Sequence, residues 1–126
     1  MTTLSRPAAV LAWVLQIALA AMYFFAAANK FSGDPMMVQY FGALGLGQWF
    51  RYFTATIETA GAVGLLIPRF APLAALVLMM VMIGAVISHF IVGGSPMMPI
   101  VLFLALGTVV YLRRAQLHLP VVGRSR

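Results

Sequence analysis

Four long apolar segments, separated by charged residues, prolines and glycines, constrain the fold of this chain more than any other feature. They cover residues 7–29, 49–67, 72–92 and 96–112. A helix needs about 20 residues, with a range of roughly 17–25, to cross a bilayer. Because a spanning segment must pair its backbone polar groups internally, each segment is expected to be a helix. The sequence therefore predicts an all-α fold, a bundle of four transmembrane helices.

The charged residues lie at the ends of these segments rather than along one face of each. They make up 8% of the chain, whereas 63% of its residues are hydrophobic, and soluble domains carry about 25% charged residues. The first segment could instead be a signal peptide, but its apolar run of about 20 residues exceeds the 7–15 of a signal sequence. We therefore expect an integral membrane protein, with residues 1–126 forming one domain.

The stretch between the first two segments is too apolar for a solvated loop. Asp34 and Pro35 form a helix start, with Asp34 as the expected cap. Methionine and aromatic residues follow, and glycines at positions 42, 45 and 47 end the run. The pattern predicts a short amphipathic helix in the first extracytoplasmic loop, lying on the membrane or re-entering the bundle.

The basic residues define the topology. Four spans place six arginines on the side of the termini, against only Lys30 and Arg51 on the other side. The six are Arg6, Arg69, Arg113, Arg114, Arg124 and Arg126. The positive-inside rule then predicts that both termini are cytoplasmic. Arginines at the cytoplasmic surface of the lipid bilayer account for the net charge of +6. No nucleic-acid partner is therefore expected.

Glu58 is the one charge inside the second apolar segment, and one of only two acidic residues in the chain. A charged side chain at the centre of a bilayer costs about 2.5–3.5 kcal/mol on insertion scales. Such residues usually face a bundle interior or an aqueous cavity and have a partner. The function of the chain is therefore expected to depend on the group that pairs with Glu58.

Other polar residues share helix faces with one another. Gln16, Tyr23 and Lys30 are spaced by seven, so they form one stripe of the first helix. We hypothesise an outward-facing polar ligand pocket, with no catalytic residue and no metal site assigned. Its candidate residues are Lys30, Glu58, His89, Arg51, Tyr23, Thr54 and Gln16.

Each candidate also has a purely structural interpretation. Glu58 and Gln16 can bond a neighbouring helix, and Lys30 and Arg51 can anchor at lipid headgroups. Two pairs of small residues, Ala60/Gly64 and Gly84/Ser88, additionally predict close contacts between helices.

Several short motifs, in this order and spacing, resemble the DoxX-like family over nearly the whole chain. The motifs are Ala28-Asn29-Lys30-Phe31, Pro35-Met36-Met37, the run from Gly42 to Tyr52, Glu58-Thr59-Ala60-Gly61-Ala62, Leu65-Leu66-Ile67-Pro68-Arg69, His89 and Leu112-Arg113-Arg114. The resemblance implies a small bacterial four-helix protein of the inner membrane. The better-known DoxX and DoxD relatives are associated with quinone-linked oxidation of sulfur compounds and with membrane antioxidant complexes, whereas the DoxX-like branch, which this chain resembles most, is largely without an assigned activity.

This resemblance favours an accessory subunit of a membrane oxidoreductase, with a quinone as a candidate ligand and no enzymatic activity of its own. The chain has no cysteine, which excludes thiol chemistry, so redox chemistry would need a bound cofactor or partner. Two alternatives stay open: a non-enzymatic scaffold or assembly factor, and a small transporter that works as a homodimer.

Overall fold

The computed structural model describes residues 4–117, and all regular structure in that part of the chain is helical. The predicted all-α class is therefore confirmed. The helices are α1 (Arg6–Ser32), α2 (Pro35–Leu44), α3 (Trp49–Leu65), α4 (Ala71–Val92), α5 (Met97–Leu112) and the short 3-10 helix η1 (Arg114–Leu117). Arg124 and Arg126, which entered the topology argument, lie outside the described residues.

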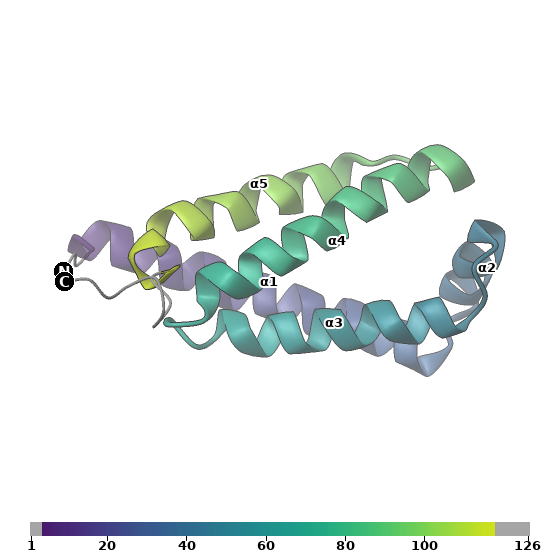
Figure 1. The fold of residues 1–126 in the computed structure, drawn as a ribbon, viewed down its shortest axis with the longest axis horizontal. Coiled ribbons are helices and arrows are strands. Elements are labelled where there is room, and N and C mark those ends of the chain that lie inside the picture. Colours follow the sequence, from purple (N-terminus) through teal and green to yellow (C-terminus); the bar gives the residue numbers. More distant parts are fainter. Residues whose placement is uncertain (1–3, 118–126) are drawn as a thin grey trace.

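The four long helices form two pairs that diverge along the molecule. α1 lies against α3, α4 lies against α5, and α3–α4 and α1–α5 contacts join the two pairs into a ring (Figure 1). α1 begins and α5 ends at one end of the molecule, where the pairs converge, and α2 lies at the other end. We call these the closed end and the open end.

The helix boundaries follow local sequence signals. The Ser5 hydroxyl accepts a hydrogen bond from the Ala8 N–H at 3.3 Å, and Gly33 ends α1 in the left-handed region at φ 78°. Asp34 occupies the N-cap position of α2 as expected, but its side chain makes no capping hydrogen bond. α5 begins one residue later than expected, because Pro96 is its N-cap.

The closed end is tightly packed around small residues. Leu65, Leu78 and Leu106 are fully buried there. A Cβ on Gly61 would lie 2.7 Å from the Leu78 side chain, and one on Gly64 would lie 2.8 Å from the Ala74 Cβ. Close helix approach at Gly64 is therefore confirmed.

The other predicted small-residue contact is wrong. A Cβ on Gly84 would meet nothing within 4 Å, because α4 separates from α3 toward the open end (Figure 1).

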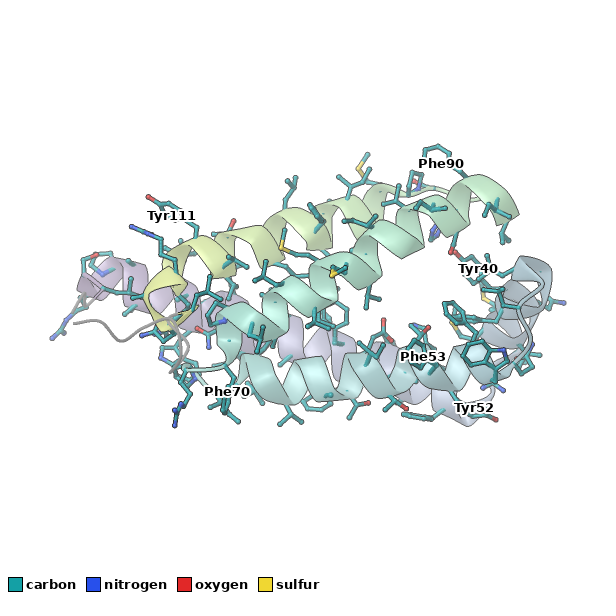
Figure 2. The ribbon with its side chains drawn as sticks, in the orientation of Figure 1. Tyr40, Tyr52, Phe53, Phe70, Phe90 and Tyr111 are labelled. Carbon is teal, nitrogen blue, oxygen red and sulfur yellow. The ribbon has the colours of Figure 1, made fainter. Side chains whose placement is uncertain are left out.

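The outer surface of the helices is apolar, as expected of a membrane protein. α1 and α4 are each long and apolar enough to cross a bilayer, while α5 is apolar but shorter. Large hydrophobic side chains point outward along the bundle, among them Phe90, which is 76% exposed (Figure 2). In water, a partner would have to cover this apolar surface along its whole length. In a bilayer, the lipid covers it directly.

Candidate ligand-binding site

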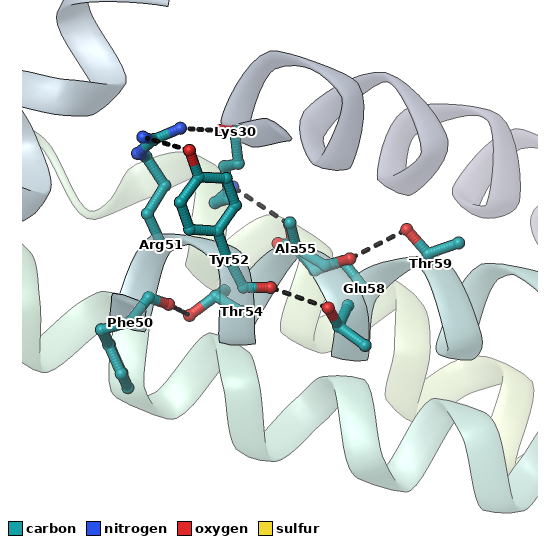
Figure 3. A network of polar contacts seen from close by, with 9 residues as sticks. Lys30, Phe50, Arg51, Tyr52, Thr54, Ala55, Glu58 and Thr59 are labelled. Carbon is teal, nitrogen blue, oxygen red and sulfur yellow. Dashed lines mark hydrogen bonds and ion pairs between the residues drawn. The ribbon is translucent and has the colours of Figure 1, made fainter. Parts of the chain in front are cut away.

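The partner of Glu58 is Lys30. The Lys30 Nζ lies 3.1 Å from the Glu58 Oε1, and the two side chains are 13% and 4% exposed (Figure 3). The pair joins the last turn of α1 to the middle of α3. A buried charge is retained most cheaply when an opposite charge compensates it, so this contact explains how an acidic residue is tolerated in an apolar helix.

Arg51 holds the end of α1 in place beside this pair. Its Nη1 donates to the Lys30 carbonyl oxygen, and its Nη2 donates to the Tyr52 hydroxyl at 3.1 Å (Figure 3). Its Nε donates to the Gln48 Oε1 at 2.8 Å. The last carbonyls of a helix have no partner within the helix, and Arg51 supplies one. Arg51 is therefore buried as a support for Lys30 and does not line the cavity described below.

Two hydroxyl groups lie on the same helix faces as the ion pair. Tyr23, two turns before Lys30, is 2% exposed, and its hydroxyl is buried with no hydrogen-bond partner among the described residues. Thr54 lies one turn before Glu58, and its Oγ1 donates to the Phe50 carbonyl at 2.9 Å. The unpartnered Tyr23 hydroxyl leaves one donor free close to the ion pair.

A second polar group lies nearer the open end, where α2 meets α4. The His89 Nδ1 lies 2.7 Å from the Ala85 carbonyl oxygen and 3.4 Å from the Tyr40 hydroxyl. A carbonyl only accepts, so Nδ1 carries the hydrogen in the shorter contact. Tyr40 reaches from α2 toward α4 in Figure 2, and burial raises the pKa of its hydroxyl. Tyr40 thus attaches α2 to the end of α4.

These polar groups line one cavity of about 910 Å³ between the diverging helix pairs. Small-molecule sites in proteins usually measure about 300–1,000 Å³. Of the candidate residues, Tyr23, Lys30, Thr54, Glu58 and His89 line this cavity. The rest of its wall is mainly apolar and includes six methionines and four phenylalanines. They are Met22, Met36, Met37, Met80, Met82, Met98, Phe25, Phe41, Phe50 and Phe53.

Gln16 lies elsewhere, at the closed end. It is fully buried, its Nε2 donates to the Leu65 carbonyl at 2.7 Å, and its Oε1 accepts from the Arg113 Nε at 2.8 Å. The Arg113 guanidinium also lies 5.4 Å from the centre of the Trp13 ring. Gln16 thus joins α1 to the ends of α3 and α5, which is the packing alternative left open by the sequence.

Four polar residues of the cavity wall were not among the sequence candidates: Asn29, Tyr40, Ser88 and Ser95. Asn29 directly precedes Lys30, and Ser88 directly precedes His89, so adjacency to a candidate was the available signal. No such signal existed for Tyr40, because only the docking of α2 brings it to His89.

The fold and the cavity define a helical membrane protein with a ligand-sized chamber. The sequence profile of the DoxX-like family matches residues 14–111, more than three quarters of the chain. The chain belongs to the DoxX-like family. No curated protein and no solved structure gives a significant match.

Proposed function

We propose that α1, α3, α4 and α5 cross the bacterial inner membrane as four spans, with both termini in the cytoplasm. At a rise of about 1.5 Å per residue, the shortest of them, α5, extends about 24 Å, and a short span is accommodated by local thinning of the bilayer. α2 then lies on the extracytoplasmic side. The arginines near the closed end, including Arg69 and Arg114, support this orientation.

Within that membrane, the protein holds an amphipathic ligand in the cavity and serves as an accessory subunit of a quinone-linked redox system. The observation that carries this proposal is the Lys30–Glu58 pair, 3.1 Å apart, in the wall of a mainly apolar chamber of about 910 Å³. Apolar walls with a few convergent polar groups are the usual composition of a small-molecule site.

A quinone fits the chemistry of this wall. Its ring carbonyls only accept hydrogen bonds, and the Lys30 ammonium and the unpartnered Tyr23 hydroxyl are donors. Its apolar tail suits the methionine and phenylalanine surface, since methionine adapts to irregular shapes. When bound, a quinone supplies electron and proton transfer, while the chain positions the headgroup and excludes water. Oxidation of a substrate then belongs to a partner oxidoreductase.

The test is native mass spectrometry of the protein purified in mild detergent, with lipid extraction alongside. We expect a defined amphipathic ligand in the native protein, and its loss in Glu58→Gln. Thr56→Val is the matched control, because Thr56 is an exposed residue of the same helix that lies outside the cavity wall. A bare native protein, or one bound in fixed ratio to another membrane protein, would contradict the ligand and favour a scaffold.

A further inference from the structure

Resting on that proposed function, we infer that the cavity selects ligands by headgroup charge. It takes a neutral headgroup with a hydroxyl or carbonyl oxygen and rejects both anionic and cationic amphipaths. The inference names the ligand class: a lipid-soluble molecule that carries no net charge.

The first argument is charge balance. Among the described residues that line the cavity, Lys30 is the only lysine, Glu58 is the only acidic residue, and there is no arginine. Because they lie 3.1 Å apart, each is already compensated. An ionised headgroup would either break this pair or add a third charge beside it, and in both cases one buried charge is left uncompensated, which is strongly unfavourable. A neutral headgroup can bind without disturbing it.

The second argument is the Tyr23 hydroxyl, which has no hydrogen-bond partner among the described residues. The side chain is 2% exposed, and it belongs to the cavity wall. A buried donor without a partner costs about 1–3 kcal/mol. A ligand oxygen beside the ion pair would supply the missing acceptor, and a carbonyl or hydroxyl does so without adding charge.

The third argument concerns the route of entry. Phe25, Phe53 and Met80 line the cavity although they are 69%, 50% and 71% exposed. They lie on α1, α3 and α4, so the cavity reaches the flanks of the long helices. In a bilayer these flanks face the acyl chains, where neutral amphipaths dissolve readily. The tail of the ligand can therefore remain in contact with lipid while the headgroup reaches Lys30 and Glu58.

The test uses three probes with one tail and different headgroups: hexadecanol, hexadecyl sulfate and hexadecyltrimethylammonium. The two ions keep their charge at every working pH. In competition for the full-length protein, followed by native mass spectrometry, we expect hexadecanol to be retained at least tenfold better than either ion. Thr56→Val should behave like the native protein.

Substitutions then change the selectivity in defined directions. Glu58→Gln leaves the Lys30 charge unpaired, so the ratio of sulfate to alcohol should rise at least tenfold. The double variant Lys30→Met/Glu58→Gln is neutral again and should recover the preference for alcohol. Tyr23→Phe should weaken hexadecanol binding several-fold without changing the order of the probes. Tyr23→Phe and the double variant keep the test decisive if Glu58→Gln does not fold.

The outcomes separate the two proposals. Equal retention of all three probes, or an unchanged ratio in Glu58→Gln, overturns the charge selectivity and leaves the ligand-holding function standing. Failure of all three to bind the native protein overturns the ligand-holding function, and the selectivity with it.

Discussion

The two ends of the bundle use similar polar residues for different purposes. At the closed end, Gln16 accepts from Arg113 and donates to the Leu65 carbonyl, at 2.8 and 2.7 Å. At the open end, Arg51 satisfies the Lys30 carbonyl, but Lys30 and Glu58 face a cavity. In each case a side chain donates a hydrogen bond to a carbonyl in the last turn of a neighbouring helix. The two ends differ because the contact lies among packed helices at the closed end and beside the cavity at the open end.

Packing accounts for the difference. Small residues at the closed end let α3 and α4 approach until a single added Cβ at Gly61 would overlap Leu78. Toward the open end the same two helices separate, and Gly84 has no neighbour within 4 Å of an added Cβ. Polar residues therefore serve as structural ties where the helices touch, and remain available to a ligand where the helices diverge.

The largest effect on stability is expected for the ion pair at the open end. Lys30→Met leaves the buried Glu58 without its partner, and removing one member of a buried pair costs about 3–5 kcal/mol. We expect about 3 kcal/mol, because the Lys30 side chain keeps 13% exposure. This loss is measured as the change in the free energy of unfolding, obtained by titrating the protein in mixed micelles with a denaturing detergent.

A double-mutant cycle sharpens this prediction. Lys30→Met/Glu58→Gln should recover most of the loss, because no uncompensated charge remains. If the double variant is as unstable as the sum of the two single variants, the pair contributes no coupling, and the open end owes its stability to packing alone.

The next effect is expected at the closed end. Gln16→Leu leaves the Leu65 carbonyl and the Arg113 Nε without their partner, and an unsatisfied buried polar group costs about 1–3 kcal/mol. We expect a loss of about 2 kcal/mol with unchanged ligand retention, since Gln16 does not line the cavity. Unfolding titration and native mass spectrometry on the same sample measure both. Loss of ligand at unchanged stability would show that the two ends are not separate.

The positions of the helices could be deduced from the sequence, but the division of polar residues between the two ends could not. Helix positions followed from apolar length, prolines and glycines, and the observed bounds depart from the expected ones by at most three residues. The candidate residues came from helical spacing, which assigns a face of one helix but not its neighbour. Gln16, Tyr23 and Lys30 share one stripe of α1, yet Gln16 belongs to the closed end. Their different roles follow from the divergence of the helix pairs, which a single helix face does not reveal.

A smaller effect is expected for matched substitutions of two helical glycines. Gly61→Ala should destabilise the fold by about 1–2 kcal/mol, because overpacking forces side chains to shift. Gly84→Ala should stabilise it by about 0.5–1 kcal/mol, because alanine is the better helix former and its methyl group meets no atom within 4 Å. Thermal unfolding of both variants checks the opposite signs. Equal signs would contradict the contrast between a packed end and an open one.

The smallest effect is expected at the contact between α2 and α4, and it depends on pH. Burial raises the pKa of the Tyr40 hydroxyl, so the folded state holds this proton more tightly than the unfolded chain. The contribution is therefore fully present below the ordinary tyrosine value of about 10 and is lost as pH rises above it. Tyr40→Phe should cost about 0.5 kcal/mol near neutral pH and remove the decline in stability above about pH 10.

Hydrogen exchange of α2 in the native protein and in Tyr40→Phe tests whether this contact restrains the helix. Faster exchange confined to α2 is expected, whereas faster exchange throughout the bundle would mean that the open end and the closed end unfold as one unit.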